Sequence, residues 1–103
     1  MTSTATRRVA DNAERAGQIA EILKAVAHPL RLRIVALLCK SEAEVNALAE
    51  QLGAPQAIVS QQLRILRMHR LVRASRSNGR ATYRLLESRL RDLVNCMEHC
   101  SVQ

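Results

Sequence analysis

The chain has 103 residues and a net charge of +7, and it contains no Phe or Trp and a single Tyr. A chain of this length forms one small domain, and its core must be built from aliphatic side chains. No apolar run approaches the roughly 18 residues that a membrane span needs, and the first residues lack the apolar segment of a secretory signal, so we expect a cytoplasmic protein with no membrane partner. All but two of the 16 basic residues are Arg, which suits phosphate binding but also an ordinary solvated surface.

The first half of the chain predicts an N-terminal arm and two helices. Residues 1–15 are rich in Thr, Ser and Ala and show little periodicity, so we expect a flexible arm before a domain at 16–103. From Ile19 the apolar side chains recur at helical spacing, and the helix ends before Pro29 because proline disfavours helix at the residue before it. Pro29 suits the first turn of a second helix, which we expect to reach about Cys39.

Two further helices with a short turn follow. Residues 41–44 read Ser-Glu-Ala-Glu, the form of a capping box, which predicts the start of a third helix at this point. Its apolar positions lie at helical spacing within 45–52, and Gly53 is typical of a helix end. Pro55 opens a fourth helix that runs to about His69. Two short helices joined by a turn that contains Gly form a helix-turn-helix.

Segment 56–66 of the fourth helix has the composition of a DNA-reading helix. Its apolar face consists of Val59, Leu63 and Leu66, and its polar face contains Gln56, Ser60 and Gln61. Amide side chains pair bidentately with adenine edges, and a Ser hydroxyl serves a base or a phosphate. We therefore expect the polar face to read bases; the alternative is a plain helical hairpin with a polar outer face.

After this helix the pattern predicts a basic hairpin. Segments 71–76 and 80–85 flank Ser77-Asn78-Gly79, and Asn-Gly is the strongest short hairpin signal because both residues tolerate positive φ. Four arginines line the ribbon: Arg73, Arg76, Arg80 and Arg84. A basic hairpin directly after a helix-turn-helix is typical of a wing that lies against phosphates or in the minor groove. The predicted DNA contacts are Gln56, Ala57, Ser60, Gln61, Arg64, Arg76, Asn78 and Arg80.

A last helix is predicted at about Glu87 to Cys100. One stripe of this segment is apolar and comprises Leu86, Leu90, Leu93, Val94 and Met97. A small aliphatic core gives a marginal monomer, so we expect this stripe to pack against its symmetry mate and the first helix in a homodimer.

The order of these elements resembles that of the ArsR/SmtB family of bacterial repressors. The matching segments are Leu-Lys-Ala-Val-Ala-His-Pro-Leu-Arg-Leu-Arg-Ile at 23–34, residues 45–52, Val-Ser-Gln-Gln-Leu at 59–63 with Leu66, and 79–83 in the hairpin. The resemblance covers about residues 19–100. It implies a mostly α fold with a β-hairpin wing, in the order α-α-α-α-β-β-α.

The resemblance also implies a function. A homodimer of this family binds an inverted-repeat operator in double-stranded DNA, with its recognition helices in successive major grooves about 34 Å apart, and leaves the DNA when an effector binds. We expect no cofactor and no enzyme activity, because the sequence has no Gly-rich phosphate loop, activated Ser or His pair, or clustered carboxylates. The alternative function is that of an architectural DNA-binding protein that responds to no ligand.

Several positions depart from the family pattern. The family's metal box of two cysteines in the first helix of the helix-turn-helix is absent from 45–50, and Asp92 with His99 cannot reproduce its interfacial zinc pattern. Pro55 replaces a common N-cap Ser, and Gln62 stands where the family often has His. We expect His28 and His69 to be structural.

Three cysteines carry the remaining chemistry: Cys39, Cys96 and Cys100. The family contains thiol-redox and persulfide sensors with one Cys on the second helix and one on the last, which implies that Cys39 and Cys100 form the sensing pair, with Cys96 secondary, although Cys39 lies about one turn late. Alternatively, Cys96, His99 and Cys100 share a helix face and suit Zn²⁺ or arsenite, with or without Cys39. Cys39 is also a candidate for an ordinary core residue.

Overall fold

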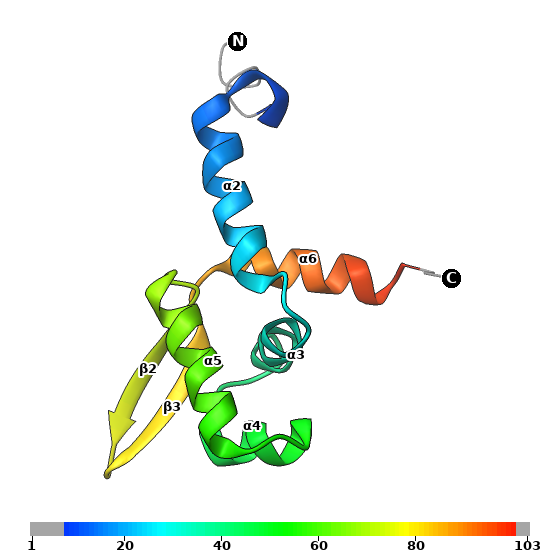
Figure 1. The fold of residues 1–103 in the computed structure, drawn as a ribbon. Coiled ribbons are helices and arrows are strands. Elements are labelled where there is room, and N and C mark those ends of the chain that lie inside the picture. Colours follow the sequence, from blue (N-terminus) through cyan, green and yellow to red (C-terminus); the bar gives the residue numbers. More distant parts are fainter. Residues whose placement is uncertain (1–7, 101–103) are drawn as a thin grey trace.

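A computed structural model describes residues 8–100 (Figure 1). Its elements are a 3-10 helix η1 (Val9–Asp11), helices α2 (Ala13–Val26) and α3 (Pro29–Leu38), strand β1 (Ala43–Glu44), helices α4 (Val45–Leu52) and α5 (Gln56–Met68), strands β2 (Val72–Ser77) and β3 (Arg80–Leu85), and helix α6 (Ser88–Glu98). The predicted order of four helices, a hairpin and a last helix is confirmed, and η1 and β1 are additional. None of the described helices is both long and apolar enough to cross a membrane.

Polar side chains define the starts of the first two α-helices. Asn12 begins α2, because its Oδ1 accepts a hydrogen bond from the backbone N–H of Arg15 at 3.0 Å. Helix α2 therefore starts inside the segment 1–15 that we expected to be an arm, whose residues 1–7 lie outside the described residues. The Nδ1 atom of His28 accepts from the N–H groups of Leu30 and Arg31 at 3.2 and 3.5 Å, so His28 is a helix cap, as its structural assignment predicted.

The capping box predicted at 41–44 is wrong. Ala43 and Glu44 form β1, an edge strand that pairs antiparallel with β3. Helix α4 begins only at Val45, and the Glu44 side chain makes no capping hydrogen bond. The backbone groups of this segment are thus satisfied by a strand more than thirty residues away in sequence, as the pairing of Ala43 with Tyr83 illustrates. The resulting sheet has the order β1-β3-β2.

The helix-turn-helix consists of α4 and α5, which pack on α3. Gly53 ends α4 with φ of 63°, a left-handed conformation that glycine adopts without a steric cost. In α5, Val59, Leu63 and Leu66 are fully buried, which confirms the predicted apolar face. The core is aliphatic throughout, and the base of the hairpin joins it through Val72 and Leu85.

Helix α6 divides its apolar stripe between two surroundings. Leu90 and Val94 are buried in the core of the protomer itself, with 2% and 7% of their surface exposed. Leu86 and Met97 remain exposed. The expectation that the stripe packs against its symmetry mate and the first helix is therefore corrected for Leu90 and Val94, which are buried within the protomer where α6 crosses α3 (Figure 1).

Candidate nucleic-acid interface

The polar face of α5 is held outward by the burial of its opposite face. Pro55 is the N-cap residue and precedes the helix in extended conformation, with φ of −62° and ψ of 142°. Every α5 residue that we predicted to contact DNA is exposed to solvent: Gln56, Ala57, Ser60, Gln61 and Arg64. Gln56 lies at the α4–α5 turn, where it lines a shallow depression with Asn46 and Gly53.

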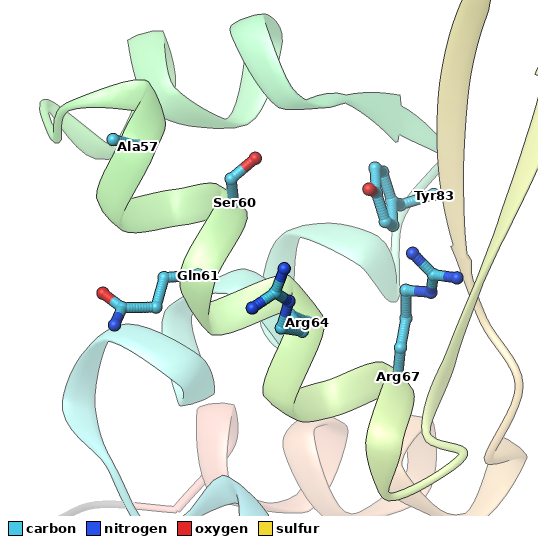
Figure 2. Close-up of a pocket in the computed structure, with 6 residues that line it drawn as sticks. All are labelled: Ala57, Ser60, Gln61, Arg64, Arg67 and Tyr83. Carbon is cyan, nitrogen blue, oxygen red and sulfur yellow. The ribbon is translucent and has the colours of Figure 1, made fainter.

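A groove runs between α5 and the hairpin. It has a volume of about 470 Å³ and is lined by Ala57, Ser60, Gln61, Arg64, Arg67 and Tyr83 (Figure 2). We call it the helix–wing groove. Four of these residues were predicted from the sequence, and none of the six is acidic. A concave basic surface of this kind suits a nucleic-acid backbone.

Sequence reasoning missed Arg67 and Tyr83. Arg67 was within reach of the pattern, because it follows Arg64 by three residues and Ser60 by seven, which places all three on one helical face. Tyr83 could not be predicted from the sequence, because the face of the hairpin on which it lies depends on the strand register and on where the hairpin packs.

The hairpin closes through the two residues that the sequence indicated. Ser77 pairs with Arg80, and the intervening Asn78 and Gly79 have φ of 55° and 76°. Positive φ at both central residues is the type I′ conformation, whose twist matches that of the strands. Asn78 is therefore at the exposed tip of the wing, where we predicted it.

The register separates the wing arginines between two faces. Side chains alternate along a strand, so Arg76 shares the face of Tyr83, the face toward α5. Arg80 lies on the opposite face with Arg73 and Arg84. Its Nη1 is 3.6 Å from the Oε2 of Glu44 on β1, and its side chain is 74% exposed. An exposed ion pair of this kind contributes about 0–1 kcal/mol, so a phosphate can replace the carboxylate.

Gln62, which departs from the family pattern, faces inward rather than toward a ligand. Its Oε1 accepts a hydrogen bond from Nη1 of Arg31 at 2.9 Å. The Nε of the same arginine donates to the carbonyl oxygen of Ala25 at 2.6 Å. Arg31 thus joins the end of α2 and the start of α3 to the recognition helix, and Gln62 has a structural role.

The three cysteines differ in exposure. Cys39 follows the last residue of α3 and is half-buried, whereas Cys96 and Cys100 are exposed. Burial raises the pKa of the Cys39 thiol, Arg91 on α6 opposes this shift, and Glu98 adds to it. All three thiols are free.

Cys39 lies beside α6. It lines a pocket of about 240 Å³ with Arg91, Asp92, Asn95 and Glu98 from that helix, and Nε of Arg91 donates to its carbonyl oxygen at 3.2 Å. His99, in contrast, has its Nδ1 2.7 Å from the carbonyl oxygen of Asn95. Within residues 8–100, no three His, Cys, Asp or Glu side chains are grouped closely enough to hold a metal ion.

A helix-turn-helix with a basic groove and an adjoining β-hairpin defines the winged helix-turn-helix class of DNA-binding protein. Residues 28–74 match the family model of bacterial regulatory proteins of the arsR family. The chain is 38% identical over 87 residues to the biofilm growth-associated repressor of Xylella fastidiosa, an alignment that covers 84% of this chain and 76% of that protein. The chain therefore belongs to the arsR family and is a transcriptional regulator of the ArsR/SmtB repressor type.

Solved structures agree with this assignment. The transcriptional repressor BigR from Xylella fastidiosa superposes with a TM-score of 0.80 at 36% identity, covering 87% of this chain and 94% of that one. The homodimeric winged helix-turn-helix domain of Mb0332 from Mycobacterium bovis gives a TM-score of 0.72 at 31% identity, with coverage of 84% and 80%. Both likenesses extend over most of the chain.

Proposed function

We infer that this protein is a homodimeric repressor that leaves an inverted-repeat operator when its cysteine thiols react with reactive sulfur species or an oxidant. The observation that carries the sensing part is the position of Cys39 at the end of α3, beside α6. Helix α3 packs directly on the recognition helix α5. A covalent change at Cys39 that displaces α3 would therefore also displace the DNA-reading surface.

The base-reading part rests on the exposed polar face of α5. Gln56→Ala or Ser60→Ala should cost about 1–3 kcal/mol of specific binding and spare non-specific affinity. The operator is first obtained by in vitro selection from a random duplex pool, and affinities for the selected and random duplexes are then compared. An equal loss on both would show that these side chains do not read bases.

We expect the two arginines next to the tip of the wing to contribute differently to DNA binding. Arg76→Gln should weaken binding on all sequences and lower the slope of log K against log salt by about one. Arg80→Gln should have the smaller effect, because its side chain faces away from α5 and has Glu44 as a partner. Unchanged slopes in both variants would indicate that the wing stays in solvent.

The dimer part rests on an uncovered apolar groove formed by α2, α3 and α6. Its volume is about 510 Å³, and it is lined mainly by Leu23, Val26, Ala27, Leu32, Ala36, Leu93, Val94 and Met97, with Arg33 and Glu98 as its charged residues. Leu23, Leu32 and Met97 are each 45–55% exposed, so apolar side chains from three helices face solvent in this groove. A second copy is the occupant that we infer, and the homodimeric Mb0332 domain is a precedent in a similar fold.

Point variants test the dimer without removing core residues. Met97→Glu should convert the protein to a monomer in sedimentation equilibrium, because a charge is then buried in the interface. The matched control is Met68→Glu: Met68 is 74% exposed and lies on α5, outside the groove. A monomeric wild-type protein, or a Met97→Glu dimer of unchanged affinity, would contradict the assignment.

The sensing chemistry follows from the exposures of the thiols. Cys100 or Cys96, being exposed, reacts first, and the half-buried Cys39 closes the bridge. With a hydropersulfide, one donor transfers a sulfur atom to the first thiol and leaves as its thiol. A second donor accepts two electrons and two protons as the trisulfide closes and leaves as thiol and hydrogen sulfide. With hydrogen peroxide, two thiols lose two electrons and two protons to form a disulfide, and the oxidant becomes water.

A bridge would pull α6 toward α3. This movement changes the apolar groove that both helices line and hence the spacing of the two recognition helices. Release would follow because the bridged form makes fewer contacts with two half-sites of fixed spacing. A direct bond needs the two Cα atoms within about 7 Å, while an inserted sulfur relaxes this requirement.

Cys39→Ser is the decisive variant. It should bind DNA like the wild type, still acquire the first adduct in mass spectrometry after treatment with a hydropersulfide, and fail to release DNA. Cys96→Ser and Cys100→Ser identify the second thiol. Normal release by Cys39→Ser would refute the bridge. Loss of DNA affinity with Zn²⁺ or arsenite, reversed by a chelator, would transfer sensing to Cys96, His99 and Cys100.

A further inference from the structure

Arg67 and Tyr83 are two groove residues with no assigned role. Arg67 occupies the last turn of α5, and Tyr83 lies on β3, on the opposite wall of the helix–wing groove. In Figure 2 the side chains of Arg67 and Tyr83 extend toward each other in the space between helix and wing, and Arg64 lies in front of α5. A guanidinium and a phenol hydroxyl from two separate elements therefore face one concave surface.

Neither of the two groove arginines is neutralised by a carboxylate. The ion pairs found within residues 8–100 involve Arg8, Lys24, Arg80 and Arg89, but not Arg64 or Arg67. No acidic residue lines the groove. Two uncompensated positive charges one helical turn apart attract an anion, and the planar fork of Arg matches phosphate oxygens.

The position of Arg67 along α5 indicates a phosphate rather than a base. Gln56 and Arg67 stand at opposite ends of the helix, and a rise of about 1.5 Å per residue separates them by roughly 16 Å. The major groove is about 12 Å wide. When the N-terminal end of α5 reads bases, its C-terminal end therefore lies over the strand that borders the groove.

We propose that Arg67 and Tyr83 together hold one phosphate of the DNA strand that passes between the recognition helix and the wing. The Arg67 guanidinium and the Tyr83 hydroxyl donate to non-bridging oxygens of that phosphate. This contact fixes the angle between α5 and the duplex, because it joins two protein elements to one point of the backbone. The proposal rests on the proposed DNA-binding function and assigns it two further positioning residues.

The salt dependence of binding separates a phosphate contact from a structural role. Binding to a fluorescent random-sequence duplex of about 30 bp is measured by anisotropy between about 50 and 200 mM salt. Arg67→Gln should lower the slope of log K against log salt by about 0.9, the value for one phosphate contact, and Arg67→Lys should restore most of it. Tyr83→Phe should reduce affinity about 3- to 10-fold with an unchanged slope, because the hydroxyl is neutral.

Arg84→Gln is the matched control. Arg84 is the neighbour of Tyr83 on β3 and points to the opposite face of the hairpin. The same loss of charge there should leave the slope within about 0.3 of the wild type. Tyr83→Phe keeps the ring that packs against the core, and thermal melting verifies that each variant is folded.

A double variant completes the test. If Arg67 and Tyr83 hold the same phosphate, the combined loss in Arg67→Gln/Tyr83→Phe is smaller than the product of the single losses. Equal slopes for Arg67→Gln and Arg84→Gln, or wild-type affinity of Tyr83→Phe, would overturn the proposal. Absence of duplex binding by the wild type would instead overturn the proposed function. Loss of slope in Arg64→Gln but not in Arg67→Gln would leave the function intact and reject only the shared phosphate.

Discussion

The hydrogen bonds of Arg31 provide a sharp test of how the recognition helix is held. One guanidinium nitrogen donates to the carbonyl oxygen of Ala25 at 2.6 Å and another to Oε1 of Gln62 at 2.9 Å. Arg31→Met removes both bonds and keeps an unbranched, apolar side-chain stem. The carbonyl oxygen of Ala25 and the Gln62 amide then lose their protein partner at a junction of three helices.

The expected magnitude follows from these two bonds. A hydrogen bond to a charged group contributes about 1.5–3 kcal/mol to the free energy of unfolding. Arg31 is half-buried, so water replaces part of the loss and the lower value applies to each bond. We expect Arg31→Met to lose about 3 kcal/mol, which lowers Tm by more than about 10 °C for a domain of this size.

Urea unfolding followed by circular dichroism measures the loss, at one fixed protein concentration. Arg64→Met is the control: it makes the same change at an exposed site of α5 and should alter stability by less than about 0.5 kcal/mol. In a double-mutant cycle, Arg31→Met and Gln62→Leu should show a coupling energy of at least about 1 kcal/mol. A loss in Arg31→Met no larger than that of the control, or additive effects in the cycle, would refute the structural role of this arginine.

Three further predictions concern backbone conformation and thiol reactivity. Gly79→Ala should destabilise the protein by about 1–2 kcal/mol in urea unfolding, because φ at this position is +76° and an added Cβ meets no neighbouring atom, so the cost is conformational alone; an unchanged midpoint would contradict it. Arg70→Gly should stabilise it by about 1 kcal/mol, since Arg70 lies in the turn directly after α5 with φ of 60°, where glycine is favoured; a lower midpoint would argue against this reading. At pH 7 iodoacetamide should alkylate Cys39 more slowly than Cys96 and Cys100, because burial raises the pKa of Cys39 and leaves less thiolate. The rate for Cys39 should continue to rise above pH 9, the ordinary value for a thiol, and equal rates in peptide mapping at pH 7 would show that burial does not protect it.

The wing and the helix-turn-helix were predictable because their signals are local. Asn78 and Gly79 tolerate positive φ wherever they occur, so the turn was fixed by two adjacent residues. The buried face of α5 followed from the period of 3.6 residues, which needs no knowledge of the partner. Once the buried face was known, residues on the opposite side of that helix, such as Ser60, could be predicted to be exposed.

The predictions that were wrong concern segments for which two different packing or hydrogen-bonding partners are available. The segment 41–44 has the composition of a capping box, but its backbone pairs with β3, since strand pairing satisfies the same groups through a distant segment. The stripe on α6 is continuous in sequence, yet Leu90 faces the core and Met97 faces solvent, because packing on α3 covers only part of a helical face.

By itself, the sequence determined the order of the helices, the turn of the wing, the family and most of the exposed polar face of α5, because each depends on spacing within a few residues. The tertiary structure alone decided which side of the hairpin each arginine occupies, that Gln62 binds Arg31 instead of a ligand, and that Tyr83 shares a groove with Arg67. These relations join residues far apart in the chain. They depend on strand register and helix packing, which are set by burial of the whole core and not by any local pattern.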